Sequence, residues 1–239
     1  SVVAGRPLVS LSLALNYALG GLRVFGYHAV NVSLHLCAAL LVYGIVRRTL
    51  TGKRLAFHDG PQAQGLAFAT ALLWVVHPLL TESVTYVVQR SELLFGIGLL
   101  LTCYSVIRAD AAGSGRRWQV VAVAACASGM ASKEVMVCAP LLVALYDWIF
   151  LARSGRELWQ RRGRMYLGLA ATWLLLALLI TQTHKPAAGF TFAQLTPWDY
   201  AKTQCGVILH YLRLAVWPNP LVVDYFDWPV ARSLTAWLP

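Results

Sequence analysis

The sequence predicts an all-α protein that crosses a membrane several times, with six to seven transmembrane helices joined by short loops. Hydrophobic residues make up 58% of the 239 residues, and the mean hydropathy is +0.60. Charged residues make up only 13%, whereas a soluble domain has about a quarter. These charges are bunched between long apolar runs. In hydrocarbon each backbone polar group must be satisfied within the structure, which favours spanning helices.

The apolar runs give the predicted spans in order. They cover about residues 27–46, 65–84, 93–107, 118–138, 139–152 and 165–183, with a weaker one at 203–217. Several are shorter than the roughly 20 residues that a perpendicular helix needs. We therefore expect polar ends such as TES and SKE to belong partly to helices. The opening RPLVSLSLALNYALGG is either a helix along the interface or the tail of an earlier span.

We interpret the chain as one transmembrane domain in three parts. Residues 1–26 form an interfacial or partial span, 27–183 the transmembrane core, and 184–239 an outer loop plus a further membrane or interfacial helix. Whether 203–217 crosses the bilayer or lies along it is left open. The start SVVAG has neither an initiator Met nor a basic leader, so we expect a fragment of a longer chain.

Basic residues predict the orientation. The net charge is +10, and cytoplasmic loops of membrane proteins carry an excess of Lys and Arg. Twelve of the 20 basic residues fall in three alternate loops: Arg47, Arg48, Lys53 and Arg54; Arg108, Arg116 and Arg117; Arg153, Arg156, Arg161, Arg162 and Arg164. These loops should be cytoplasmic and contact anionic lipid, and we expect no nucleic-acid partner.

With this topology, the polar stretches HPLLTES, QRSE, ASKE and THKP all fall on the opposite, non-cytoplasmic face. Ionisable residues in a membrane segment are costly and mark a functional site by default. Glu82, Arg90, Lys133 and Glu134 are therefore candidate site residues.

In YHAVNVSLH, the polar residues His28, Asn31 and His35 share one helix face. Hydrogen bonding between helices explains such a face, and a site role is left open for His28, which lies nearer the outer end. No Asp, Glu or Cys completes a metal site here.

In HPLLTE, Pro78 should kink or end the preceding helix. His77 and Glu82 could then either cap the interface or approach a water-filled cavity. Arg90 could pair with Glu82 or hold a phosphate with its planar guanidinium.

In SKE, adjacent Lys133 and Glu134 do not face each other on a helix, so each needs another partner. Lys133–Glu82 and Glu134–Arg90 are the pairs that we consider, with function and structural pairing both open.

The remaining polar residues are weaker candidates. We expect a structural or interfacial role for Asp147 and treat Asp224 and Asp227 as candidate carboxylates if their loop is outside. The five cysteines lie in apolar runs without metal-ligand spacing, so we predict no metal site from them.

Several of these motifs occur in a recognisable order: RPL…LNY…G (6–21), YHAVNVSLH (27–35), HPLLTESVTYVVQRSELL (77–94), SKE (132–134) and TPWDYAKTQ…YLRL…P (196–218). Together they resemble the membrane region of the transmembrane and tetratricopeptide-repeat O-mannosyltransferase family and its bacterial relatives, in the glycosyltransferase-C superfamily. The resemblance covers nearly the whole chain, and the HP-x-x-TE…R-S-E block with the later SKE is its most specific part.

The resemblance implies a membrane enzyme that transfers a sugar, mannose in the named family, from a polyprenyl-phosphate donor to a hydroxyl of a protein or other acceptor. The reaction would take place on the non-cytoplasmic face of the bacterial inner membrane or of the endoplasmic reticulum. Arg90 and Lys133 would hold the phosphate, while His77, Glu82, Glu134 and His28 would orient donor or acceptor. A divalent cation and partner subunits are left open.

The sequence departs from the superfamily in one respect. The acidic catalytic motif of these enzymes lies upstream of the RPL segment, and here no acidic residue precedes Asp59. The catalytic residue is therefore unknown in this chain. The chain is either a fragment of an active enzyme or a non-catalytic scaffold subunit. A transporter with a relay through Glu82, Lys133 and Glu134 is a third alternative, although no internal repeat supports it.

Overall fold

The computed structural model describes residues 5–55, 60–111, 115–182, 196–222 and 230. The chain divides into two units, residues 1–183 and 184–239, and each is described by itself. All regular structure in the described residues is helical, which confirms the predicted all-α class.

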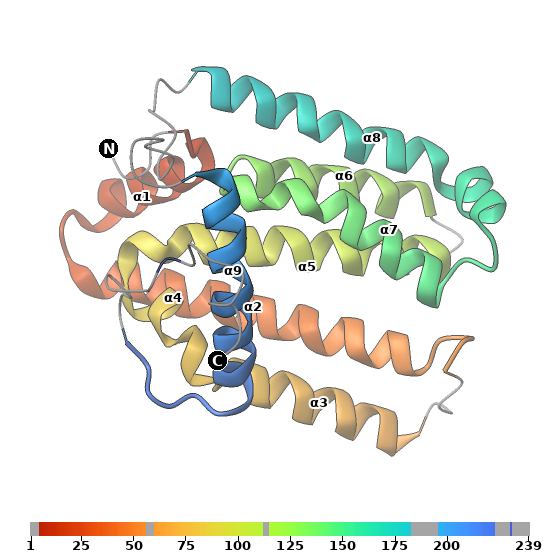
Figure 1. Cartoon of the computed structure of the whole chain (residues 1–239), viewed down its shortest axis with the longest axis horizontal. Coiled ribbons are helices and arrows are strands. Elements are labelled where there is room, and N and C mark those ends of the chain that lie inside the picture. Colours follow the sequence, from red (N-terminus) through yellow and green to blue (C-terminus); the bar gives the residue numbers. More distant parts are fainter. Residues whose placement is uncertain (1–4, 56–59, 112–114, 183–195, 223–229, 231–239) are drawn as a thin grey trace. The chain divides into compact units, whose positions relative to one another are not determined.

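Eight α-helices and three short 3-10 helices make up the described part of the first unit. They are α1 (Pro7–Gly20), α2 (Val24–Leu50), α3 (Pro61–Val75), η1 (Pro78–Leu80), α4 (Thr81–Thr85), η2 (Val87–Gln89), α5 (Arg90–Ala111), α6 (Gly115–Met130), η3 (Glu134–Cys138), α7 (Ala139–Phe150) and α8 (Gly155–Gln182) (Figure 1).

Three stretches of the described chain are long and apolar enough to cross a membrane: Val24–Leu50, Val87–Ala111 and Gly155–Gln182. A fourth span results if α3 and the helical segment Pro78–Thr85, which are bent by 53°, are counted together. The prediction of six to seven spans also counted α6 and α7, which have only 16 and 12 residues. At 1.5 Å per residue α7 is about 18 Å long, and η3 precedes it without a gap.

Two breaks explain the difference between apolar runs and helices. As predicted, the helix before Pro78 ends there, since α3 stops at Val75. The predicted span 118–138 is wrong at its end, because α6 stops at Met130 and a 3-10 helix begins at Glu134. The polar residues Ser132 and Lys133 occupy this second break, but without a proline the sequence predicts them as the polar end of a span.

α5 forms the middle of the first unit, with α6 on one side and α2 on the other (Figure 1). Its contact with α6 is close at Gly98, where an added Cβ would lie 3.0 Å from Cα of Gly129. Met136 packs on Gly129, since a Cβ added to Gly129 would lie 2.6 Å from Sδ of Met136. The buried core joins α5, α6, α7 and α8 through Val106, Cys126, Val143 and Leu169 among others. This packing fixes the ends of the four helices relative to one another.

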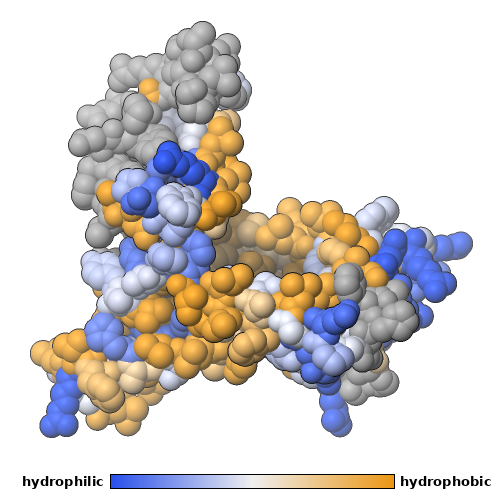
Figure 2. Space-filling view, turned by 90° about the horizontal axis from the view of Figure 1, so that it is seen from below, coloured by the Kyte–Doolittle hydropathy of each residue, from blue (hydrophilic) through white to orange (hydrophobic). Residues whose placement is uncertain are grey.

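Large hydrophobic side chains also cover the outer surface. Leu40 on α2, Leu73 on α3 and Leu174 on α8 are 69%, 70% and 74% exposed, and Figure 2 shows hydrophobic surface between hydrophilic patches. In a membrane protein such residues face lipid, because lipid tails are as apolar as the side chains. The chain is thus a helical membrane protein.

The second unit contains α9 (Pro197–Val216) in its described part. Thr196 caps it, since its Oγ1 accepts a hydrogen bond from the backbone N–H of Asp199. The Asp199 carboxylate is bonded to Nζ of Lys202 at 2.6 Å, which, together with the Thr196 hydroxyl, lowers the pKa of that carboxyl. α9 carries the charged residues Asp199, Lys202 and Arg213, and the interfacial and spanning alternatives for 203–217 both stay predictions.

Candidate functional site

Arg90 is the most deeply buried of the predicted site residues, with none of its surface exposed. Its Nε donates to Oδ1 of Asn31 at 2.8 Å. Its two terminal nitrogens donate to the backbone carbonyls of Ser12 (3.1 Å) and Tyr27 (3.2 Å). The guanidinium also lies 5.8 Å from the centre of the Tyr27 ring. Arg90 therefore ties the start of α5 to α1 and α2, and no carboxylate of the described chain forms an ion pair with it.

Asn31 and His35 extend this contact along α2. The Asn31 amide also donates to the carbonyl of Val84, at 3.3 Å. Nε2 of His35 lies 2.9 Å from the carbonyl of Val75, the last residue of α3, and its ring stacks on Trp74. Hydrogen bonding between helices is thereby confirmed for Asn31 and His35. His28 is half-buried and has no hydrogen bond to any residue that the structure describes.

Lys133 and Glu134 follow the end of α6 and reach two different helices. Nζ of Lys133 forms an ion pair with Glu92 of α5, and Glu134 pairs with Arg6 at 3.1 Å. The predicted pairs Lys133–Glu82 and Glu134–Arg90 are therefore wrong. The physical reason is that Arg90 points inward to neutral acceptors, which leaves Glu134 to an arginine at the start of α1.

His77 and Glu82 flank the break after α3. Nδ1 of His77 accepts a hydrogen bond from the backbone N–H of Leu79 and so caps the short helix there. Glu82 accepts a hydrogen bond from Nε2 of Gln89 at 2.8 Å, and not from Arg90, the partner considered from the sequence. These contacts are the capping and pairing expected at an interface.

The residues of this end form what we call the outer polar layer: Arg6, Asn31, Glu82, Arg90, Glu92, Lys133 and Glu134. The structure brings Arg90, Lys133 and Glu134 to the same end of the first unit, since Glu92 lies two residues after Arg90. Sequence reasoning missed Arg6 and Glu92 as partners, although both stand inside the quoted motifs. Asp224, Asp227 and the THKP segment lie outside the described residues.

Metal coordination was also considered. No group of three His, Cys, Asp or Glu side chains that could hold a metal ion occurs in the described ranges. The described residues thus offer no ligand set for a divalent cation, and we assign no step to one.

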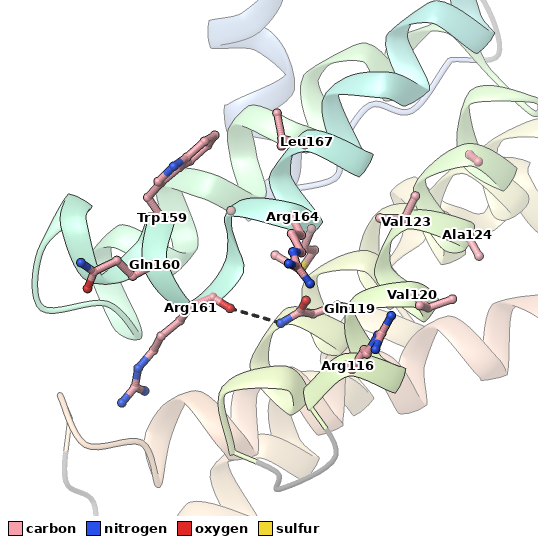
Figure 3. A pocket seen from close by; sticks show the side chains of 13 residues that line it. Arg116, Gln119, Val120, Val123, Ala124, Trp159, Gln160, Arg161, Arg164 and Leu167 are labelled. Carbon is pink, nitrogen blue, oxygen red and sulfur yellow. Dashed lines mark hydrogen bonds between the residues drawn. The ribbon is translucent and has the colours of Figure 1, made fainter.

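At the other end of the unit, a groove of about 1010 Å³ runs between α6 and the first half of α8 (Figure 3). Arg116 and Gln119 line it from α6, and Arg161 and Arg164 from α8. The groove lies among the loops predicted to be cytoplasmic and takes no part in the outer polar layer.

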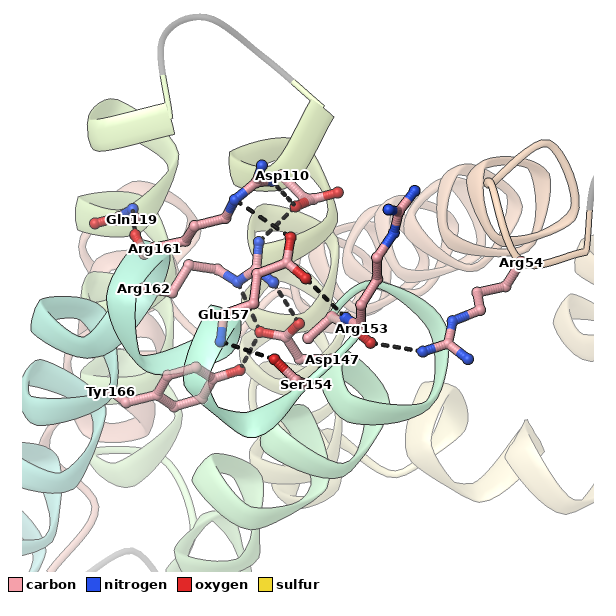
Figure 4. A network of polar contacts seen from close by, with 11 residues as sticks. Arg54, Asp110, Gln119, Asp147, Arg153, Ser154, Glu157, Arg161, Arg162 and Tyr166 are labelled. Carbon is pink, nitrogen blue, oxygen red and sulfur yellow. Dashed lines mark hydrogen bonds and ion pairs between the residues drawn. The ribbon is translucent and has the colours of Figure 1, made fainter.

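Beside this groove lies a buried ionic cluster centred on Arg162 (Figure 4). Its guanidinium donates to both carboxylate oxygens of Asp147 (2.7 and 2.6 Å) and to Asp110 (2.6 Å). The Tyr166 hydroxyl donates to Asp147 at 2.7 Å. Asp147 is fully buried, so the structural role predicted for it is confirmed: it joins α7 to α8, and Arg162 extends the cluster to Asp110 of α5.

Contacts around this cluster join the three arginine-rich loops. Arg54 donates to the carbonyl of Ala152 at 2.7 Å, and Arg161 lies 3.6 Å from Asp110. The prediction that the three loops share one end is thereby confirmed, while the side of the membrane on which they lie stays a prediction.

The two polar ends are separated by the length of α5. Arg90 and Asp110 are 20 residues apart on this helix, which corresponds to about 30 Å at 1.5 Å per residue. The hydrocarbon core of a bilayer has about the same thickness. Both ends therefore fit the two boundaries of one membrane.

Comparison with known proteins gives relatives over almost the whole chain. It is 30% identical over 244 residues to protein O-mannosyl-transferase Tmtc2 of Drosophila melanogaster, which covers 97% of this chain and 25% of the relative. It is 30% identical over 257 residues to protein O-mannosyl-transferase Tmtc1 of the same species, covering 97% and 28%. With human protein O-mannosyl-transferase TMTC4 it shares 33% identity over 162 residues, covering 62% and 21%.

The chain thus spans about a quarter of the length of the first two relatives. No family model matches the chain. No solved structure matches it either.

Proposed function

We propose that this chain is the membrane region of an enzyme that mannosylates protein. The chain belongs to the TMTC protein O-mannosyl-transferase family and spans about a quarter of the length of its first two relatives. The similarity over 97% of the chain to proteins of that name is the observation that carries this conclusion. The apolar helices support a location in a membrane. We assign the chain to the endoplasmic reticulum membrane or, in a bacterium, to the inner membrane.

The finer proposal concerns the donor. A polyprenyl-phosphate sugar has its lipid in the bilayer and its phosphate at the boundary, where the outer polar layer lies. We assign this layer to the non-cytoplasmic face, because the arginine-rich loops lie at the other end. The donor phosphate would thus meet Lys133 and Arg6 at the level where its chain leaves the hydrocarbon.

In the reaction, a hydroxyl oxygen of the acceptor protein forms a bond with the anomeric carbon of mannose. The bond from that carbon to the phosphate oxygen breaks, and the phosphate leaves with the electron pair. The hydroxyl proton goes to a general base, a role that we assign to no residue of this chain. The chain's own contribution is to bind the phosphate and offset its negative charge.

Lys133 is the cation best placed for this contribution. Its side chain is 21% exposed and its partner Glu92 is 32% exposed, so a phosphate could replace Glu92 at Nζ. Arg90 is buried and fully engaged with neutral acceptors. In this conformation it is a positioning residue, which holds α1 and α2 against the start of α5. Glu134 would hold Arg6, while His77, Glu82 and His28 line the same boundary.

The test is sugar transfer by the full-length protein with single substitutions. Lys133→Ala should raise KM for a polyprenyl-phosphate mannose donor at least tenfold, because a charge-assisted hydrogen bond to phosphate is lost. Arg90→Ala should lower activity and stability together. Lys53→Ala is the matched control, since Lys53 is an exposed lysine in an arginine-rich loop. An unchanged KM for the donor in Lys133→Ala would end the phosphate-binding proposal, whatever the effect of Arg90→Ala.

A non-catalytic scaffold is the rival function, and one observation favours it. Arg6, Arg90, Lys133 and Glu134 all have partners within the described chain. The same experiment separates the two functions, because a scaffold would show no transfer in the wild type, and Lys133→Ala would alter only its stability or assembly.

A further inference from the structure

We propose that the groove between α6 and α8 binds an anionic glycerophospholipid, with the phosphate held by Arg116 and Arg164 and an acyl chain along the apolar floor. This site lies at the opposite end of α6 from the outer polar layer, so it goes beyond the proposed transfer reaction and does not depend on it.

The first support is the charge of the groove. No aspartate or glutamate is among its lining residues, whereas three arginines are: Arg116, Arg161 and Arg164. Arg161 is turned towards Asp110 and Glu157, with ion-pair distances of 3.6 and 3.4 Å. Arg116 and Arg164 form neither an ion pair nor a hydrogen bond with any residue in the described part of the chain. The groove therefore carries uncompensated positive charge.

The acidic residues Asp110 and Asp147 near the groove already form ion pairs with another arginine. Asp147 and Asp110 bind Arg162, which lies on α8 two residues before Arg164. Because these carboxylates are held by a buried arginine, they cannot neutralise the groove. An anion from outside the protein is the partner that the charges fit.

The second support is the arrangement of polar and apolar lining. In the view of Figure 3, Arg164 extends from α8 in the direction of Gln119 and Arg116 of α6, while the Arg161 side chain points away from them. Gln119 is fixed there, since its Nε2 donates to the carbonyl of Arg161 at 3.3 Å. Two guanidinium groups beside an amide can hold the non-bridging oxygens of one phosphate.

Below these polar groups, the groove continues along apolar residues towards the membrane interior. Val120 and Leu167 are 64% and 59% exposed, and Val123, Ala124 and Ala127 continue the wall on α6. Trp159, which is 57% exposed, lines the groove at the polar end, where tryptophan is enriched at membrane boundaries. A phosphate with an attached acyl chain fits this sequence of polar rim and apolar wall, and a free phosphate would use only the rim.

Basic pockets between membrane helices are a recognised type of site for lipid head groups. The volume of about 1010 Å³ suffices for a head group and part of one chain. The proposal thus commits to a lipid, and its distinction from a free anion is part of the test.

The experiment measures lipid binding to the full-length protein in detergent by native mass spectrometry. Phosphatidylglycerol is the anionic probe, and phosphatidylcholine with the same acyl chains is the neutral comparison. The double variant Arg116→Gln with Arg164→Gln should lose about 25-fold in affinity for phosphatidylglycerol, because each arginine near an anionic lipid contributes about fivefold.

The matched control is Arg117→Gln with Arg156→Gln, which removes two exposed arginines of the same end that do not line the groove. It should bind phosphatidylglycerol like the wild type. An equal loss in this control would overturn the proposal in favour of general attraction to a basic surface. Equal affinity of the wild type for phosphatidylcholine would overturn it as well.

A second pair of variants tests the acyl chain without a change of charge. Ala124→Trp fills the apolar wall and should weaken phosphatidylglycerol binding, whereas Val121→Trp, outside the groove lining, should not. Glycerol 3-phosphate is expected not to displace the lipid at equal concentration. Displacement, or wild-type binding by Ala124→Trp, would show a bare anion site and refute the lipid proposal.

Discussion

Replacing Asp147 by alanine should strongly destabilise the first unit. Asp147 is fully buried and accepts three hydrogen bonds of 2.6–2.7 Å, two from Arg162 and one from Tyr166. Removal of one partner from a buried ion pair costs about 3–5 kcal/mol, because it leaves the other charge without compensation. Arg162 keeps Asp110 at 2.6 Å, so we expect a loss in the free energy of unfolding of about 3 kcal/mol, at the lower end of that range.

The assay is unfolding of the purified protein by SDS in mixed micelles, followed by loss of helical circular dichroism. Arg161→Ala is the control, since Arg161 is 58% exposed and its two ion pairs measure 3.4 and 3.6 Å. Exposed pairs contribute about 0–1 kcal/mol, and the control should stay within that limit.

A paired substitution checks the cause. Asp147→Leu with Arg162→Met replaces the buried ion pair by apolar side chains, a change that is often neutral or stabilising. Asp110, which is 17% exposed, keeps Arg161 at 3.6 Å. The paired variant should therefore recover much of the stability that Asp147→Ala loses. A loss below about 1 kcal/mol for Asp147→Ala, or no recovery in the paired variant, would refute an uncompensated buried charge as the origin of the effect.

Two further predictions concern packing and protonation. Gly98→Ala should lower the free energy of unfolding by about 1–3 kcal/mol, because the new Cβ would lie 3.0 Å from Cα of Gly129 and push α5 and α6 apart. The control Gly96→Ala, whose Cβ would meet nothing within 4 Å, should be neutral or slightly stabilising in the same SDS titration. Equal losses of stability in the two variants would contradict the argument. Lys202 lowers the pKa of the Asp199 carboxyl, so the ion pair between them stabilises α9 at pH values above the ordinary carboxyl pKa, and this stabilisation is lost as the pH falls through the lowered pKa. NMR titration of the Asp199 carboxyl should show a higher pKa in Lys202→Ala. An unchanged pKa would exclude Lys202 as the cause.

The sequence predicts the helical class and most helix positions because hydrophobicity and proline act locally. Pro78 ends its helix for a reason that the sequence displays, since proline lacks the N–H that a continuing helix needs. The end of α6 at Met130 has no comparable signal. Ser132, Lys133 and Glu134 form a polar stretch there, but polar residues alone do not end a helix as proline does.

The side-chain partners could not be predicted, because they depend on the short 3-10 helices between the spans. A turn of 3-10 helix has three residues instead of 3.6, so it changes the direction of every side chain that follows. Arg90 comes directly after η2 and points inward to Asn31. Lys133, in the break between α6 and η3, pairs with Glu92, which lies 41 positions earlier and also follows η2. The sequence places these groups at one end, and only their three-dimensional arrangement selects the partner.

The two ends of the bundle balance their buried arginines in different ways. Arg162 has two carboxylates within 2.6–2.7 Å, so its charge is compensated inside the protein. Arg90 has only an amide oxygen and two carbonyls, and dipoles compensate a charge less completely than an anion does. A buried cation of this kind favours a negative charge nearby more than a compensated one does. This difference supports our proposal that the phosphate of the sugar donor lies at the end that carries Arg90.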